Sequence, residues 1–569
     1  MIDDIVEAAS RERDTGDHDE LTVVNWWRRL ATGRDKEIAV LEAGEGVSFG
    51  DLDRRSADLA WALLDAGYGK GSRIALLMGN SADWIAAWLA TQRIGALAVF
   101  VSSFFAEQEL RHALRHADAQ LLLLDPAYLH HDYLARMETA FPDLAAHEGS
   151  GPLLIDEAPY LRAVWTSKPA ARAWVETDFA SAARTGQRVA ARAPALLDRI
   201  AAEIHPADAS AIIYTSGSTA HPKAVVHRQG VVADKIRFLA GNNAVIPADT
   251  GAGDRVLVTM PLFWVGGFLS CFGALERGAS VAFSPALPAA RLWDEIETIG
   301  ATHVTGPDAT LRSLQDHIGP GCRLADRLKP QNSNQMAWFR GEQGYDPDSI
   351  GSAFGMTETM GPHSGFRSID DTYGMQAGSL GGALGRMERR IADPVTEEDV
   401  APGTEGELRV RGPWLMEGYY KQQRGTGLDD RGYFRTGDRC IIDDADRLHF
   451  VGRDSGMIKT SGANVAPEEV ENALRQCDEV IEAVVIGMPD PVRGQLVVAF
   501  VAPRPGAALD ADMLRDWLRP RVSSFKIPRR FLFMPFDDMP RTASNKIHRG
   551  ALAEIAEARA RTDEGIPTN

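Results

Sequence analysis

Cysteine is scarce in this sequence, and long apolar runs are missing. The four cysteines show no C-x-x-C spacing, so neither a disulfide framework nor a zinc site is expected. No stretch approaches the roughly 18 apolar residues of a membrane-spanning helix, so we expect no membrane span. The first residues are acidic and lack the cationic and apolar segments of an export signal. These absences favour a reducing, cytoplasmic setting.

Positive charge is also in deficit. The chain has 61 Lys and Arg against 79 Asp and Glu, which gives a formal net charge of −18. Nucleic-acid binding needs clustered basic residues, so we expect no nucleic-acid partner. A Walker phosphate loop is missing as well, because no Gly-x4-Gly-Lys-Ser/Thr run occurs. A phosphate site in this chain must therefore use another kind of loop.

The apolar pattern near the N-terminus predicts an α/β fold. Amphipathic stretches at 51–64 and 83–92 alternate with short apolar runs at 73–78 and 96–101. This alternation is typical of a parallel sheet covered by helices. A second α/β region is expected at about 210–370. With 569 residues, the chain should form more than one domain.

Three further segments differ in pattern. Residues 140–200 are rich in Ala and Arg with weak periodicity, which indicates helices or a surface excursion. Residues 378–452 contain short apolar runs separated by glycines, which predict a compact β barrel or sheet. The chain after Gly452 has both β and α patterns, and we expect it to form a separate unit.

The most informative segment is a hydroxyl-rich loop between apolar runs at 211–214 and 224–227. The runs predict flanking structure that makes the loop a turn on a rigid frame. Glycine lets backbone N–H groups approach an anion, hydroxyls donate hydrogen bonds, and lysine adds a mobile charge. A solvated turn is the alternative interpretation, which the Pro-Lys at its end disfavours. The expected phosphate-binding residues are Thr215, Ser216, Gly217, Ser218, Thr219 and Lys223.

Two later motifs carry carboxylates. The first presents an aromatic ring, a hydroxyl and a carboxylate at the end of a predicted strand, an edge where α/β proteins bind ligands. Phe354 could stack on a base, Thr357 could bond a phosphate oxygen, and Glu358 could hold Mg²⁺. In the second motif, Asp438 could accept both hydroxyls of a ribose, with the Arg453 guanidinium beside it. Taken alone, the first motif is as often purely structural as functional, and the second is more often only a turn.

In this order, the segments resemble the superfamily of adenylate-forming enzymes, in its acyl-CoA synthetase branch. The superfamily also includes adenylation domains of peptide synthetases and luciferases. The resemblance spans nearly the whole chain and extends to the sequences VSFGDL at 47–52, PLFWVGG at 261–267, PDPVRG at 489–494 and FKIP at 525–528. It implies an α/β N-terminal domain, residues 1–453, made of two α/β subdomains and a small β barrel. A small mobile α+β domain, residues 454–569, would follow a hinge near Ser455.

The resemblance implies two half-reactions at one site. A carboxylate attacks the α-phosphate of ATP to give acyl-AMP and pyrophosphate, and a thiol then displaces AMP. In the first step Lys546, in a polar loop near the C-terminus, would neutralise developing negative charge. In the second, Gly462 would leave room for the pantetheine arm of the thiol. The expected ligands are therefore ATP or AMP (as acyl-AMP), coenzyme A and Mg²⁺, the last held by Glu358.

The acid and the thiol are predicted from a few side chains. Many amino-acid adenylation domains have an Asp after the aromatic residue of the Pro-Leu-Phe motif, where this chain has Trp264, so an α-amino acid is not expected. Phe263, Trp264 and Phe268 favour a bulky apolar carboxylic acid, with core packing as the alternative for each except Trp264. Trp338 and Phe339 are further pocket candidates. Lys526 is placed to meet a phosphate of CoA.

Four positions depart from the family pattern. Ala220 replaces the second glycine of the phosphate loop, and Asn545 replaces the glycine before the last lysine. Ser455-Gly456 stands where the hinge usually carries a charged pair. Residues 328–339 show no Gly-Gly-Ala-Pro or Gly-Ser-Ala-Pro segment. All four concern the first half-reaction or the change between the two.

These departures leave several functions open. The main hypothesis is an acyl-CoA ligase. An alternative is a specialist that only transfers a preformed acyl-AMP to CoA, made by a separate adenylating partner enzyme. A third is an adenylating enzyme that loads a carrier protein. A non-catalytic acyl-adenylate or nucleotide binder is disfavoured by Glu358, Asp438 and Lys546. A homodimer is the candidate oligomeric state.

Overall fold

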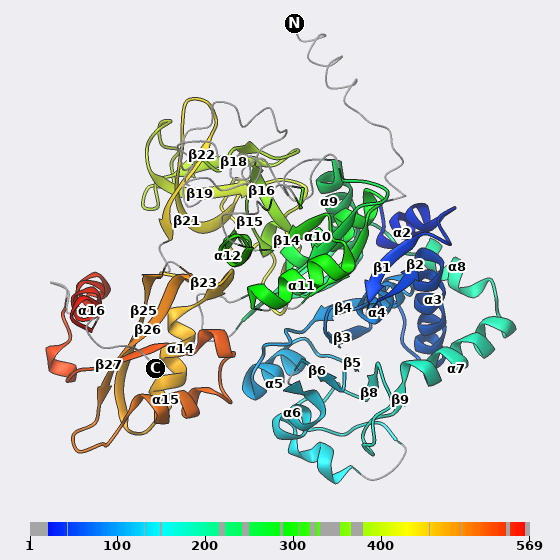
Figure 1. The fold of residues 1–569 in the computed structure, drawn as a ribbon, viewed down its shortest axis with the longest axis horizontal. Coiled ribbons are helices and arrows are strands. Elements are labelled where there is room, and N and C mark those ends of the chain that lie inside the picture. Colours follow the sequence, from blue (N-terminus) through cyan, green and yellow to red (C-terminus); the bar gives the residue numbers. More distant parts are fainter. Residues whose placement is uncertain are drawn as a thin grey trace, which may run out of the picture.

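The structure is a computed structural model, and it carries a large N-terminal unit and a smaller C-terminal unit (Figure 1). We use these names for the elements up to Arg453 and from Gly456 onward. The residues that the structure describes are 21–42, 44–129, 131–147, 151–215, 222–241, 250–284, 288–306, 308–318, 324, 327–329, 353–365, 379–453, 456–490, 492–541 and 547–563.

An eight-stranded sheet forms the centre of the N-terminal unit. Six of its strands are parallel, and β11 and β20 close one edge in antiparallel pairing. The inner strands are apolar on both faces because helices cover both faces of a parallel sheet. In spatial order the strands are β20 (Gly418–Tyr419), β11 (Lys223–Arg228), β10 (Ala209–Thr215), β4 (Leu97–Phe100), β3 (Arg73–Leu77), β5 (Leu121–Leu124), β8 (Ala163–Thr166) and β9 (Thr177–Asp178).

A second, five-stranded sheet packs beside the first. Its order is β14 (His303–Thr305), β12 (Arg255–Val258), β13 (Ser280–Phe283), β1 (Ile38–Glu42) and β2 (Glu45–Ser48). All pairings are parallel except β1 with β2. Two α/β sheets are present, as expected, but the predicted regions exchange strands. The first region supplies β1 and β2 to the second sheet, and the second region supplies β10 and β11 to the first sheet.

Helices surround these sheets. They are α2 (Val23–Ala31), α3 (Phe49–Asp65), α4 (Ala82–Arg93), α5 (Glu107–His116), α6 (Tyr133–Ala140), α7 (Phe179–Arg192), α8 (Leu196–Ala202), α9 (Gln229–Gly241), α10 (Val265–Glu276), α11 (Ala289–Ile299) and α12 (Asp308–Ile318). The VSFGDL segment encodes the start of α3. Ser48 Oγ accepts from Asp51 N, while the Asp51 carboxylate accepts from Ser48 N, which is a capping box.

The predicted surface excursion at 140–200 is in part a component of the main sheet. It includes α7 and α8, as expected from its composition, but also the buried strand β8. The sequence of β8, Ala-Val-Trp-Thr, is too short to show a period of its own. Its pairing with β5 supplies the missing information.

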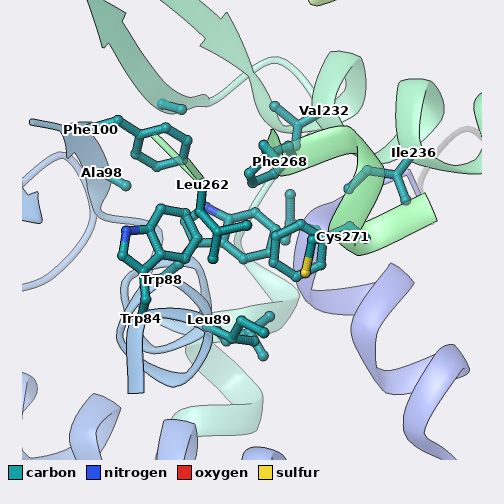
Figure 2. Packing of buried hydrophobic residues seen from close by; sticks show 14 of the residues in the cluster. Trp84, Trp88, Leu89, Ala98, Phe100, Val232, Ile236, Leu262, Phe268 and Cys271 are labelled. Carbon is teal, nitrogen blue, oxygen red and sulfur yellow. The ribbon is translucent and has the colours of Figure 1, made fainter. Parts of the chain in front are cut away.

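The core between α4 and α10 is aromatic. Figure 2 shows Trp84, Trp88, Phe100 and Phe268 packed together with Leu262 and Cys271. The Phe268 ring meets Trp88 edge to face, with centroids 4.9 Å apart, and only 1% of the residue is exposed. Phe268 is thus a core residue and does not line either cavity described below, contrary to the prediction from its position after Pro-Leu-Phe-Trp.

The region predicted as a small β barrel is an open antiparallel sheet. Its strand order is β18 (Glu388–Ala392), β19 (Gly406–Arg411), β21 (Phe434–Ile442) and β22 (Leu448–Arg453), so the first and last strands do not pair within the described residues. A further sheet joins β15 (Ala353–Met356), β16 (Gly361–Gly365) and β17 (Gly382–Ala383). The predicted short strands are present, and among the described residues they form a sheet, one of the two arrangements expected for residues 378–452.

The C-terminal unit has a sheet of its own. It contains β24 (Ala463–Val465), β23 (Ile458–Thr460), β26 (Gly494–Pro503), β25 (Val480–Asp490) and β27 (Arg530–Phe533), with helices α14 (Pro467–Arg475), α15 (Ala511–Leu518) and α16 (Arg549–Asp563). The fold is therefore mixed α/β with a large N-terminal and a small C-terminal unit, as predicted. Across the described ranges, we find no helix with the length and apolar character needed to cross a bilayer.

We predict that Phe268→Ala lowers the free energy of unfolding by about 3 to 5 kcal/mol, because it leaves a cavity among buried rings. Trp264→Ala should cost clearly less, since Trp264 is only half-buried. Urea unfolding of the two variants checks this order. An equal or larger loss for Trp264→Ala would place Phe268 outside the core.

Candidate active site

Two cavities of about 420 Å³ each adjoin one another between the N-terminal and C-terminal units. We call the first the polar pocket, because charged side chains from both units line it: Glu358, Asp438, Lys459 and Lys526. We call the second the apolar pocket, because none of its described lining residues is charged. Most of the described site candidates lie on the first.

Glu358 is fixed on the floor of the polar pocket. It belongs to the single turn Thr357–Thr359 that follows β15. Its Oε1 accepts a hydrogen bond from the Tyr419 hydroxyl at 2.8 Å, and its backbone carbonyl accepts one from Met416 N at 2.8 Å. The Nζ atom of Lys223 lies 5.1 Å from the centre of the Tyr419 ring. The lysine that ends the phosphate loop and the motif carboxylate thus meet through Tyr419.

A buried histidine supports the neighbouring residue. His227 Nε2 lies 2.7 Å from the carbonyl oxygen of Thr357. Burial lowers the pKa of His227 to about 4, so the ring is neutral at pH 7 and donates this bond through Nε2–H. The Thr357 side chain lines the polar pocket, where its hydroxyl can donate to an anion.

An aromatic ring and a second carboxylate also line the polar pocket. Phe354 comes from β15 and Asp438 from β21, and Asp438 is only 6% exposed. Asp438 N donates to Thr436 Oγ1 at 3.0 Å, which fixes the backbone at that point. The backbone of Arg453 pairs with Asp438 across β21 and β22. This places a flat ring and a buried carboxylate on one cavity.

Lys459 is a site residue that the sequence analysis missed. It lies on β23 of the C-terminal unit and lines the polar pocket, with its Nζ 5.7 Å from the centre of the Phe354 ring. The available signal was its position three residues before Gly462. Strand β23 thus brings a cation from the C-terminal unit to the predicted base-stacking ring.

Gly462 also comes from the C-terminal unit and lines the polar pocket. Its φ of +81° is in the left-handed region, and the preceding Ser461 has φ +50°. Glycine occupies this region without strain, whereas a residue with a Cβ pays about 1 to 2 kcal/mol. The turn between β23 and β24 therefore favours a glycine at this position for its backbone conformation.

An aromatic wall separates the two pockets. Phe263, Trp264 and Phe525 line both of them, and Phe104 lines the apolar pocket. The Phe104 ring is central, at 5.6 Å from Phe263, 5.8 Å from Trp264 and 5.9 Å from Phe525 between ring centres. Phe525 belongs to the C-terminal unit, so this wall is complete only when the two units meet.

Lys526 differs from its predicted role. Its Nζ lies 2.6 Å from Glu109 Oε1 and 2.7 Å from Glu469 Oε1, and 2% of the side chain is exposed. An ammonium enclosed by two carboxylates is not presented to a CoA phosphate in this arrangement. The prediction used only its sequence position and positive charge, and Glu109 lies 417 residues away.

Several predicted residues lie outside the described part of the chain. These are Ser216, Gly217, Ser218, Thr219, Ala220, Trp338, Phe339, Ser455, Asn545 and Lys546. Arg453 is described in its backbone only. Thr215, the last residue of β10, lines the polar pocket and pairs with Lys223 at the start of β11. The two strands therefore bring the ends of the predicted phosphate loop to the edge of this pocket.

The fold and the shared cavity define a two-unit enzyme with its site between the units. Residues 26–420 match the family model of AMP-binding enzymes, and residues 469–546 match that of the AMP-binding enzyme C-terminal domain. The chain therefore belongs to the family of AMP-binding enzymes, and its predicted place in the acyl-CoA synthetase branch of the adenylate-forming superfamily is confirmed.

Two curated relatives are similar over nearly their full length. An indoleacetate–CoA ligase of Aromatoleum aromaticum is 29% identical over 543 residues, 93% of this chain and 97% of the relative. A feruloyl-CoA synthase of Amycolatopsis is 29% identical over 549 residues, 93% of this chain and 98% of the relative. Both are named for acids that contain an aromatic ring.

Solved structures share the fold. An amide bond synthetase from Marinactinospora thermotolerans has a TM-score of 0.73 at 25% identity, covering 93% of this chain and 99% of that one. The o-succinylbenzoate CoA synthetase of Bacillus subtilis was solved in two forms. The form with the product analogue OSB-NCoA, a double mutant, has a TM-score of 0.70 at 21% identity, covering 93% and 98%. The form with the acyl-adenylate intermediate has a TM-score of 0.56 at 22% identity, covering 93% and 97%.

We predict that His227 makes the protein less stable in acid. Its folded pKa of about 4 is below the usual 6.5, so the unfolded chain binds a proton first. The stabilising contribution is complete above about pH 6.5 and is lost as the pH falls towards 4, for about 3 kcal/mol in total.

His227→Gln keeps an N–H donor for Thr357 but cannot titrate. Its unfolding free energy should therefore fall less than that of the wild type between pH 6.5 and pH 4. Urea unfolding over this pH range measures the difference. Parallel pH profiles for the two proteins would contradict a neutral, buried His227.

Proposed function

We propose that this protein joins a bulky aromatic carboxylic acid to coenzyme A through an acyl-AMP intermediate. The observation that carries the proposal is the shared lining of the polar pocket. Phe354, Glu358 and Asp438 of the N-terminal unit and Lys459 and Gly462 of the C-terminal unit meet on one cavity. An adenylate held there would have elements of both units around its reactive carbon.

The polar pocket suits an adenylate. The Phe354 ring offers a face for a base, and the buried Asp438 carboxylate can accept both hydroxyls of a ribose. Thr215 and Thr357 add hydroxyl donors for phosphate oxygens. Lys223 contributes positive charge at the end of the loop, where opposite charges about 4 Å apart are worth about 4 kcal/mol at an effective dielectric of 20.

Glu358 fits a role as a ligand of Mg²⁺. Its carboxylate lines the polar pocket, and its Oε1 accepts a hydrogen bond from the Tyr419 hydroxyl. Mg²⁺ prefers carboxylate and phosphate oxygens, and when bound it would neutralise phosphate charge. Tyr419 would then orient the carboxylate for this use.

The apolar pocket suits the second substrate. A pantetheine arm is long and uncharged, and the described walls of this pocket carry no charge. In the second step the sulfur attacks the acyl carbon, the C–S bond forms, and the C–O bond to phosphate breaks. AMP leaves with that electron pair, and the thiol proton passes to solvent. Phe263 and Trp264, between the pockets, lie where acyl group and thiol must meet.

Aromatic acids are favoured by two observations. The wall residues Phe104, Phe263 and Trp264 present ring surface at the junction of the pockets, and aromatic rings pack well in offset or edge-on arrangements. Two relatives of nearly the same length are named for indoleacetate and ferulate. The acid itself is to be found by experiment.

The test is a panel of acids supplied in two forms. Indoleacetic, ferulic and 3-hydroxybenzoic acid, with hexanoic acid as the non-aromatic comparison, are given with ATP and CoA, and also as synthetic acyl-adenylates with CoA. Mass spectrometry reads the thioester, and pyrophosphate exchange reads the first half-reaction. We expect thioester from at least one aromatic acid by both routes.

Other outcomes select the alternatives. Thioester from adenylates without pyrophosphate exchange would indicate a specialist that depends on a separate adenylating enzyme. Exchange without a CoA thioester would direct the search to a carrier protein, or to an amine, the acceptor implied by the name of the amide bond synthetase. Failure of every acid and adenylate in both assays would refute the proposed function.

We predict that Gly462→Leu slows thioester formation from acyl-AMP about a hundredfold and leaves pyrophosphate exchange within about threefold, because a side chain there displaces the thiol from its attack position. Gly506→Leu is the matched control. Gly506 also belongs to the C-terminal unit and has φ +85°, but among the described residues no atom lies within 4 Å of where its Cβ would be. Equal effects of the two substitutions would indicate backbone strain rather than obstruction.

A further inference from the structure

The contact between the two units contains a buried charged trio that the proposed chemistry does not use. Lys526 of the C-terminal unit bonds Glu109 on α5 of the N-terminal unit and Glu469 on α14 of its own unit. The side chains of the two carboxylates are 4% and 5% exposed. Figure 1 shows α5 on the side of the N-terminal unit that faces the C-terminal unit.

Further hydrogen bonds join the C-terminal unit to the same turn of α5. Ser523 Oγ donates to Glu109 Oε2 at 2.7 Å, and Gln108 N donates to the carbonyl of Pro520 at 3.3 Å. Ala106 N also donates to Glu109 Oε2, at 2.8 Å. Glu109 is therefore fixed within α5 and is met by several groups of the other unit.

The net charge of the trio depends on whether the two units are in contact, because Glu109 belongs to the N-terminal unit and the other two residues belong to the C-terminal unit. With both carboxylates ionised it carries one excess negative charge, which is costly in a buried site. Burial raises the pKa of Glu469 to about 7, and Glu109 adds to the rise against the attraction of Lys526. Glu469 Oε2 is buried and has no hydrogen-bond partner among the described residues, so it has no donor to stabilise a full negative charge.

The two partners of Lys526 differ in one respect. Glu469 lies in the same unit as Lys526, so this pair can persist in any orientation of the C-terminal unit. Glu109 lies in the N-terminal unit, so its bond to Lys526 exists only when the units are arranged as here. The bond from Lys526 to Glu109 is thus specific to this arrangement of the two units and stabilises it.

The arrangement also brings the neighbour of Lys526 into the site. Phe525 lines both pockets and lies 5.9 Å from Phe104, between ring centres. The same orientation presents Lys459 and Gly462 to the polar pocket. The chain also superposes better on the relative bound with a CoA product analogue, at a TM-score of 0.70, than on the same relative with its adenylate, at 0.56.

We propose that Glu109, Lys526 and Glu469 form a latch that holds the C-terminal unit in the orientation for thioester formation and sets Phe525 into the aromatic wall. The inference rests on the proposed function for its chemical consequence. The three are positioning residues: Lys526 is enclosed by the two carboxylates, and the trio acts through Phe525 and Gly462.

The latch predicts a graded order among charge variants. Lys526→Met leaves two buried carboxylates without their cation, and it should slow thioester formation from acyl-AMP about a hundredfold. Glu109→Gln leaves the Lys526–Glu469 pair intact and loses only the bond between units, so about tenfold is expected. Glu469→Gln leaves one cation and one anion, and its rate should remain within about threefold of the wild type.

Pyrophosphate exchange should fall less than about threefold in Glu109→Gln, because that half-reaction does not need this orientation. Arg519→Met is the matched control: Arg519 is an exposed residue of the same unit, paired with Asp516 on the surface. Glu109→Gln keeps the test valid if Lys526→Met does not fold. Equal losses in both half-reactions for Glu109→Gln, or equal effects of Glu109→Gln and Glu469→Gln, would overturn the latch.

A second readout needs no substrate. Cysteines introduced at Gln108 and Pro520, whose backbones are hydrogen-bonded across the boundary, are joined with a short dithiol-reactive crosslinker and scored by intact mass. Crosslinking should be efficient in the protein that carries only the two introduced cysteines, and also when Glu469→Gln is added. It should decrease severalfold when Glu109→Gln is added. Unchanged crosslinking in Glu109→Gln would refute the latch, whatever acids the enzyme accepts. A decrease in crosslinking without any detectable thioester chemistry would support the latch and refute the proposed function.

Discussion

The polar pocket depends on the hydrogen bonds that tie one short turn, Thr357–Thr359, to the edge of the eight-stranded sheet. His227 on β11 bonds the carbonyl of Thr357, and Tyr419 on β20 bonds the carboxylate of Glu358. Both donors come from strands that pair with each other, β11 and β20, so Thr357 and Glu358 are held by the hydrogen-bonded edge of the sheet. A neutral His227 is suited to this position, because a charged ring in the same fully buried site would be strongly disfavoured.

Charge is distributed unequally between the two pockets, and this difference matches two kinds of substrate. The polar pocket receives carboxylates from the N-terminal unit and lysines from the C-terminal unit, and the proposed nucleotide needs such polar partners for its phosphates and ribose. The apolar pocket has no charged residue among its described walls, as a neutral arm requires. In the proposed reaction, the aromatic wall between them would exclude water from the point where acyl carbon and thiol meet and so limit hydrolysis of a reactive adenylate.

Local patterns in the sequence predicted much of the fold and several site residues. The runs at 73–78 and 96–101 became β3 and β4, and the VSFGDL segment became a capped helix start. Phe354, Thr357, Glu358 and Asp438 meet on one cavity, the first three at the end of β15 and Asp438 in the middle of β21. Phe268 could not be placed, since an aromatic residue on an apolar helix reads the same whether it meets a ligand or Trp88.

Local sequence patterns could not predict contacts between distant parts of the chain. The Lys526–Glu109 bond joins residues 417 apart, and nothing local to either residue signals it. The strand β8 and the open order of β18 to β22 likewise follow from pairing partners rather than from periodicity. Lys459 was detectable only by its distance from Gly462, since a lone lysine on a short strand is usually a solvated side chain.

An enzyme that uses two orientations of one unit needs both to be close in free energy, because a strong preference for one would slow the half-reaction that uses the other. A fully apolar contact between the units would be difficult to tune, since its strength scales with buried area. A buried lysine with one partner in its own unit avoids this problem. When the C-terminal unit moves away, Lys526 loses Glu109 but stays paired with Glu469. The free-energy cost of this movement is therefore that of losing one of two carboxylate partners. It is smaller than the cost of leaving a buried charge with no partner. The internal pair therefore keeps the latch weak enough to open, and Glu109 makes it specific enough to define where the C-terminal unit stops.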